Sequence, residues 1–179
     1  MQATDLLHFW FDELDNPRRF AKDAALDALM RERFGSTLQA AMRGELAHWR
    51  ATPQGRLAEI IVLDQFSRNI FRDQPASFAQ DPQALTLAQA LVASGQAITL
   101  VPEQRAFGYM PFMHSESALI HAQAVLLFSE PGLEANLNFE RKHQSIIERF
   151  GRFPHRNAIL GRVSTPEEVA FLQQPGSAF

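Results

Sequence analysis

Residues 53–72 read PQGRLAEIIVLDQFSRNIFR, and the segment 57–63 within them is apolar on nearly every side. Thr52 and Pro53 stand at the start of this stretch, an order typical of a helix that begins with a capping hydroxyl and a proline in its first turn. A helix that is apolar all round belongs in the interior of a protein. The stretch therefore predicts a buried helix over 53–70.

The same signals recur along the rest of the chain. Asp81 and Pro82 repeat the pattern of a capping side chain before proline, and residues 165–168, TPEE, form a capping box with Thr165 as the cap. Apolar residues recur at spacings of three and four, which is the period of a helix packed on one face. These helix-start signals and one-sided apolar patterns indicate a chain built from helices.

Helix ends are marked as clearly. Gly95 and Gly151 stand where helices should stop, and Pro111 should break the chain between two helices. No alternating stretch is long enough to indicate a strand. The predicted helices cover residues 4–14, 23–34, 36–50, 53–70, 82–94, 102–110, 115–129, 134–150 and 166–173.

Composition limits the class of protein. The length of 179 residues and the lack of a Gly/Ser-rich linker favour one all-α domain over 1–179 with no sheet. There is no cysteine, which excludes disulfides, thiolate zinc sites and a cysteine nucleophile. The net charge is -3, so the chain lacks the basic surface expected of a nucleic-acid binder.

The apolar run 57–63 is far shorter than the roughly 20 residues of a membrane span. The N-terminus lacks a basic leader. We expect no nucleic-acid or membrane partner and a cytoplasmic location.

Three segments carry polar residues within apolar surroundings. They are 63–72 (LDQFSRNIFR), 110–117 (MPFMHSES) and 149–162 (RFGRFPHRNAILGR). In the first, Asp64, Arg68 and Arg72 are spaced four apart, which predicts that they share one helix face.

These strings, with YMPFMHSES and the ending STPEEVAFLQQPGSAF, resemble a bacterial family, domain of unknown function 924, over nearly the whole chain. The resemblance implies an all-helical array of helix pairs, similar to the superhelix of tetratricopeptide-repeat proteins, although no repeat of 20–50 residues is visible. It implies no activity. One departure is Ser67, where the family pattern DQFPRN has proline; serine should ease the helix past that point.

The polar segments predict a site for a small anionic ligand. Arg68, with Arg156 or Arg152 approaching from the C-terminal loop, would clamp a phosphate or carboxylate through planar donor forks, and Asp64 would orient Arg68. The alternative is an ion network that ties the end of a buried helix to a loop. The candidate ligand-binding residues are Asp64, Arg68, Asn69, Arg72, His114, Glu116, Arg152, His155, Arg156 and Asn157.

Two other functions stay open. One is an enzyme in which His114 or His155 is a general acid or base, oriented by Asp64 or Glu116. The other is a peptide- or protein-binding scaffold with an open groove, unless the C-terminal segment 165–179 fills that groove with Val169, Phe171, Leu172 and Phe179. No metal-binding or phosphate-loop motif is present, so neither metal nor cofactor is expected. A homodimer is compatible with the many phenylalanines.

Overall fold

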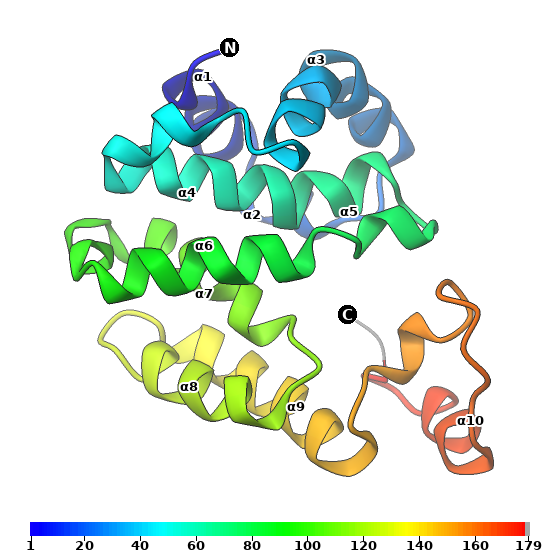
Figure 1. Ribbon diagram of the computed structural model, residues 1–179. Helices are drawn as coiled ribbons and strands as arrows, with labels where there is room; N and C mark the ends of the chain where they lie inside the picture. Colours follow the sequence, from blue (N-terminus) through cyan, green and yellow to red (C-terminus); the bar gives the residue numbers. More distant parts are fainter. Residues whose placement is uncertain (178–179) are drawn as a thin grey trace.

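The computed structural model describes residues 1–177, and every regular element among them is a helix (Figure 1). The α-helices are α1 (Ala3–His8), α2 (Asn16–Phe20), α3 (Ala24–Met42), α4 (Pro53–Ile61), α5 (Ser67–Ile70), α6 (Asp81–Ala93), α7 (Pro102–Met113), α8 (Ala118–Phe128), α9 (Glu134–Phe150) and α10 (Pro166–Leu172). Single π-helical turns are η1 (Phe9–Glu13) and η3 (Val62–Phe66), and short 3₁₀ helices are η2 (Ala47–Ala51), η4 (Pro75–Ser77), η5 (Gln96–Thr99) and η6 (Pro154–Arg156).

The predicted buried helix is present and runs without a break from α4 through η3 to α5. The residues at both junctions, Ile61 and Ser67, keep helical dihedral angles. Its start is capped as predicted, because the hydroxyl of Thr52 accepts a hydrogen bond from the amide of Gly55 at 3.1 Å. This long stretch lies at the centre of the fold, in contact with α1, α6 and α7.

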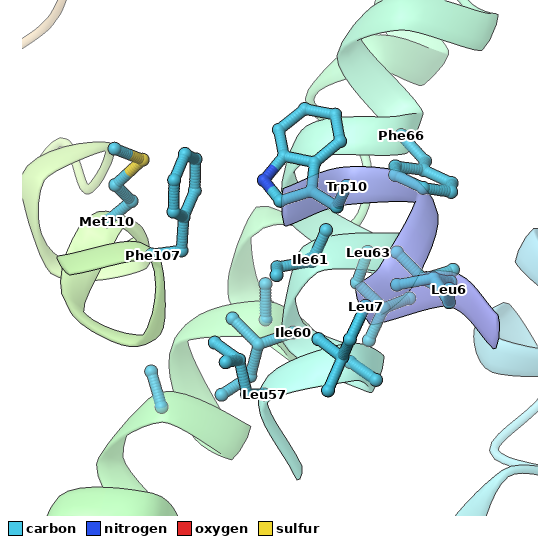
Figure 2. Close-up of a cluster of buried hydrophobic side chains, with 14 of the residues drawn as sticks. Leu6, Leu7, Trp10, Leu57, Ile60, Ile61, Leu63, Phe66, Phe107 and Met110 are labelled. Carbon is cyan, nitrogen blue, oxygen red and sulfur yellow. The ribbon is translucent and has the colours of Figure 1, made fainter. Parts of the chain in front are cut away.

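Apolar side chains of this helix pack with side chains from α1 and η1 and with side chains from α7 (Figure 2). Trp10 lies between Phe66 of η3 and Phe107 of α7, with ring centroids 5.5 Å away on either side. Fully burying one such large side chain contributes about 1.5–3 kcal/mol. The apolar segment 57–63 therefore forms the interior, as its composition predicts. The other buried residues labelled in Figure 2 are Leu6, Leu7, Leu57, Ile60, Ile61, Leu63 and Met110.

The helices form successive layers, with α6 and α7 between the N-terminal layers and the α8–α9 pair (Figure 1). A smaller apolar cluster joins the end of α9 to α10, where the rings of Phe150 and Phe171 are 5.0 Å apart. The predicted capping box at Thr165 is present, since Thr165 and Glu168 exchange backbone-to-side-chain hydrogen bonds. The finer prediction of a tetratricopeptide-like superhelix stays a prediction.

The described part of the C-terminal segment packs against the end of α9 and against η6. In its described part, up to residue 177, Phe171 contacts the end of α9, and α10 contacts η6. Phe179, which the sequence includes in a groove-filling segment, lies outside the described residues.

Some predicted helix limits are wrong for physical reasons. The separate helices 23–34 and 36–50 are one helix, α3, followed by η2. Gly35 does not end α3, because a glycine inside a helix costs only about 1 kcal/mol and the apolar stripe continues through it to Leu38 and Ala41. The five-residue α2 is absent from the prediction.

Proline and capping signals misplace three further limits. Pro111 lies inside the last turn of α7 instead of breaking the chain before it. Asp81 is the first residue of α6 and makes no capping hydrogen bond. The helix predicted from 115 begins at Ala118.

Candidate functional site

The π-helical turn η3 carries Asp64 and Gln65 into the interior. Single π-turns inside helices are rare and frequently occur at functional sites. The carboxylate of Asp64 is only 1% exposed and is held at both oxygens. Its Oδ1 lies 2.7 Å from Nδ1 of His114 and 3.0 Å from Nη1 of Arg68, and its Oδ2 accepts from Nε2 of Gln65 at 2.6 Å.

Asp64 is ionised despite its burial. Burial raises the pKa of its carboxyl, but the charges of Arg68 and His114 and the hydrogen bonds from His114 and Gln65 outweigh that effect and lower the pKa well below its usual range. An ionised carboxylate only accepts hydrogen bonds. The hydrogen in the contact between Asp64 and His114 therefore sits on Nδ1 of the histidine.

This hydrogen fixes the chemistry of His114. With Nδ1 protonated in the neutral ring, Nε2 keeps its lone pair as an acceptor. Burial lowers the pKa of His114, against the opposing effect of Asp64, so the ring is neutral at pH 7. The side chain is 16% exposed, and none of the described residues forms a hydrogen bond with Nε2. His114 is therefore held at Nδ1 by a buried carboxylate and has an available lone pair at Nε2.

Two arginines meet at one carboxylate beside this pair. Arg68 donates from both terminal nitrogens to Asp81, at 2.9 and 3.1 Å, and Arg156 donates from Nη1 to the same carboxylate at 3.1 Å. Nη2 of Arg156 donates to the carbonyl of His114, also at 3.1 Å. The guanidinium of Arg156 lies 4.6 Å from the ring centroids of both Phe78 and Phe153, which fixes its plane.

A cleft of about 510 Å³ opens over these groups. It lies where the η4 loop, the start of α6, the end of α7 and the loop after η6 meet, and its size is within the range of small-molecule sites. Its polar wall is formed by Asp81, His114, Ser115, Glu116 and Arg156. Its apolar wall includes Pro75, Phe78, Pro82, Leu85, Pro111 and Leu160.

Glu116 joins this wall to the C-terminal loop. It accepts two hydrogen bonds from Arg162, at 2.6 and 2.9 Å, and one from the backbone amide of Phe153 at 2.7 Å. Burial raises the pKa of Glu116, but Arg162 and the Phe153 amide lower it more, so its pKa lies below the usual range. The sequence places Glu116 at the start of a helix; the structure places it before α8, in the cleft wall.

Arg152 and Asn157 lie outside the cleft wall. Arg152 pairs with Glu168 through two hydrogen bonds of 2.7 and 2.8 Å, and Asn157 contacts Ser164, Arg162 and Glu168. Both residues therefore hold the C-terminal segment together.

Arg72 and Asn69 lie apart from the cleft as well. Arg72 donates to Asp27 of α3 at 2.5 and 2.7 Å, and Asn69 donates to the same carboxylate at 2.9 Å. The four-residue spacing predicts Arg72 on the face of Asp64 and Arg68, but Arg72 lies beyond the end of α5, where Phe71 leaves the helical conformation.

His155 lies beside Phe153, with ring centroids 5.6 Å apart, and is not among the residues of the cleft wall. Burial and the charge of Arg156 lower its pKa to about 4. Of the two histidines that the sequence offers as an acid or base, the structure brings His114 to a carboxylate in a cleft.

Sequence reasoning missed Asp81 and Gln65. Asp81 before a proline indicates a helix start, and this pattern does not tell whether the carboxylate caps the helix or reaches a distant arginine. Across residues 1–177, no group of three or more histidine, aspartate or glutamate side chains is placed to hold a metal ion. No helix in the same range is long and apolar enough to cross a membrane.

Comparison with known proteins places the chain in a family. Residues 6–176 match the family described as a bacterial protein of unknown function, DUF924. The chain belongs to this family. A solved structure of a protein of unknown function from Agrobacterium tumefaciens, ATU0120, is 38% identical over 96% of both chains, with a TM-score of 0.90. The resemblance seen in the sequence strings and the all-helical fold are therefore confirmed. None of the curated proteins matches the chain.

Proposed function

We propose that the cleft binds a small molecule and that His114, held by Asp64, acts as a general base toward it. The observation that supports this is the 2.7 Å contact between Nδ1 of His114 and a buried, ionised carboxylate, with the histidine in the wall of a cleft. A polar pair of this kind inside a cleft is the arrangement that acid–base catalysis requires.

The chemistry follows from the tautomer. Nε2 takes a proton from a bound hydroxyl, amine or water molecule, and the ring becomes an imidazolium. Asp64 stabilises that positive charge through Nδ1, as the carboxylate does in other aspartate–histidine pairs. Arg68 and Gln65 keep Asp64 ionised and fixed, so the base is oriented before a ligand arrives. Such a base contributes about 10²–10⁴ in rate.

Binding of an anionic group is the second candidate. It is favoured by the convergence of Arg68 and Arg156 on one carboxylate, since two such forks can clamp a ligand carboxylate or phosphate in the same way. In the structure, Asp81 occupies this position. An external anion would have to displace Asp81, which makes anion binding the weaker of the two proposals.

A panel of chromogenic esters, phosphomonoesters and glycosides tests the first candidate. Where the wild type turns over a substrate, His114→Gln should lower kcat by at least about 100-fold, within the range for loss of a general base. Asp64→Asn should lower kcat too, because an amide that donates to Nδ1 would favour the wrong tautomer. Turnover that both folded variants retain at the wild-type rate would contradict the proposal.

A further inference from the structure

The polar wall of the cleft offers mainly hydrogen-bond acceptors. We infer that its ligand carries a protonated amine attached to an apolar group; this inference rests on the proposed function of the cleft as a ligand site. More acceptors than donors remain available in this wall after the protein's own hydrogen bonds have formed.

Asp81 and Glu116 each keep acceptor capacity. A carboxylate has about four lone-pair sites. Asp81 accepts three hydrogen bonds, two from Arg68 and one from Arg156. Glu116 also accepts three, two from Arg162 and one from the Phe153 amide. The side chains are 16% and 26% exposed, so each carboxylate has room for a donor from a ligand.

His114 supplies a third acceptor. Its Nε2 holds a lone pair because Nδ1 donates to Asp64. His114, Asp81 and Glu116 all belong to the wall of the same cleft. A group with several N–H donors, such as an ammonium with three, matches a wall with acceptors on more than one side.

The arginines are not available to an incoming anion. Both terminal nitrogens of Arg156 donate to protein acceptors, and its side chain is only 8% exposed. Its Nε has no hydrogen-bond partner among the described residues, but this atom is buried and presents almost no surface to a ligand. Arg68 is engaged by Asp64 and Asp81 and does not belong to the wall. Asp81 and Glu116 are paired with Arg68 and Arg162, but neither of these arginines belongs to the wall. Among the side chains of the wall itself, two carboxylates lie with one guanidinium and a neutral histidine, so the surface that a ligand meets favours a cation over an anion.

The rest of the cleft is apolar. Phe78, Leu85, Leu160 and three prolines line it, and none of these side chains offers a hydrogen bond. This surface suits an aryl or alkyl group, as in most small-molecule sites, where apolar walls surround a few polar groups. Together the two walls fit an amine with one aromatic or branched apolar substituent.

Benzylamine and benzoate test the inference, because they have similar shapes and opposite charges, and benzyl alcohol is the neutral probe. Titration calorimetry at pH 7 would give the affinities, and imidazole NMR signals of His114 would locate the binding. We expect benzylamine to bind and to shift the Nε2 signal, and benzoate to bind at least about tenfold more weakly, as expected for loss of a charged hydrogen bond.

Glu116→Gln should weaken the binding of benzylamine by about tenfold, because the substitution removes the negative charge but keeps an acceptor oxygen. Glu45→Gln is the matched control, since Glu45 lies in an exposed pair with Arg43, and it should leave the affinity unchanged. If Glu116→Gln fails to fold, weakening of wild-type benzylamine binding by added salt gives the same information.

The outcomes separate the two proposals. Binding of benzoate at His114 with equal or higher affinity than benzylamine would overturn the amine inference and leave the cleft as a ligand site. A His114 signal that none of the three probes moves would overturn both the amine inference and the proposed site.

Discussion

Asp64 is an ionised carboxylate in the protein interior, and its partners account for this state. Replacing it by alanine would leave the charge of Arg68 with Asp81 alone and would leave Nδ1 of His114 without its acceptor. Breaking one partner of a buried pair costs about 3–5 kcal/mol. We predict that Asp64→Ala lowers the free energy of unfolding by about this amount in urea denaturation.

The control for this prediction is Asp73→Ala. Asp73 forms an exposed pair with Lys22, and exposed pairs contribute about 0–1 kcal/mol. If the two substitutions lowered the free energy of unfolding equally, Asp64 would not be the strongly stabilising buried charge described above. The stability that Asp64 provides should be present above pH 4 and lost only in stronger acid, because its pKa is lowered in the folded state.

The lowered pKa values of two buried histidines predict that the protein loses stability in mild acid. Burial lowers the pKa of His143 to about 3 and, with Arg156, that of His155 to about 4, from an ordinary value of 6.5. Between pH 6.5 and pH 4 the unfolded chain therefore binds more protons than the folded one, and stability falls as the pH falls. Each group contributes up to about 1.4 kcal/mol per pH unit.

His143→Gln should flatten this dependence, measured as the urea midpoint from pH 4 to pH 7. Glu140 has the opposite effect on stability as the pH falls, since burial raises its pKa. The wild type and the variant both contain Glu140, so its effect cancels in the comparison. An unchanged slope in His143→Gln would show that His143 is protonated in the folded state or exposed in it.

At the scale of elements, the π-turn η3 is followed by a buried serine. The side chain of Ser67 is fully buried, and its hydroxyl has no hydrogen-bond partner among the described residues. A buried hydroxyl without a partner costs about 1–3 kcal/mol, and alanine is also the better helix former. We predict that Ser67→Ala has equal or higher stability than the wild type, by up to about 1 kcal/mol, in thermal unfolding. A clear loss of stability would mean that the hydroxyl has a partner, such as a bound water.

The first π-turn depends on one arginine. Arg19 of α2 donates to the carbonyls of Trp10, Phe11 and Leu14 and pairs with Glu103 of α7, and its side chain is 3% exposed. It satisfies the carbonyls around the end of η1 and joins two helices. We predict that Arg19→Ala lowers the free energy of unfolding by about 3 kcal/mol or more, because each buried carbonyl left unpaired costs about 1–3 kcal/mol.

Arg19→Lys should be intermediate in the same urea denaturation, since lysine keeps the charge but lacks the planar fork. A lysine variant as stable as the wild type would show that charge alone, and not the directed hydrogen bonds, is what the turn needs.

Helix starts are the part of the fold that the sequence predicts best. Thr52 and Thr165 cap helices as expected, because capping depends on residues three positions apart. Asp81 shows the limit of that reasoning, since its carboxylate accepts hydrogen bonds from Arg68 and Arg156, which are 13 and 75 positions away in the sequence. The contact of Asp64 with His114 spans 50 residues, and only the packing of α7 on the central helix brings them together. The sequence offers both residues as candidates, but local patterns do not show which pairs form.

At the scale of the whole molecule, the C-terminal segment is tied to the cleft by charged contacts. Glu116 holds Arg162 and the Phe153 amide, and Arg156 reaches Asp81. We predict that Glu116→Ala speeds hydrogen exchange across residues 153–162 while the amides of α4 exchange at the wild-type rate. Faster exchange throughout the chain would show that this contact supports the whole fold.

That the chain is one domain also stays a prediction, and it has a direct check. The helix α9 contributes Leu137 to the main core and Ile146 and Ile147 to the smaller cluster, so the two clusters should unfold together. Fluorescence of Trp10 and Trp49, which lie in the main core, and far-ultraviolet circular dichroism should give one coincident transition. Separate transitions would indicate two units.

The proposed general base requires a particular protonation state of His114, and nitrogen-15 NMR of its imidazole measures that state directly. The structure predicts a neutral ring at pH 7 with the hydrogen on Nδ1 and a lone pair on Nε2, a titration below the ordinary value of 6.5, and a change of tautomer or titration in Asp64→Asn. A ring that is already doubly protonated at pH 7, or one with its hydrogen on Nε2, would contradict the proposed base.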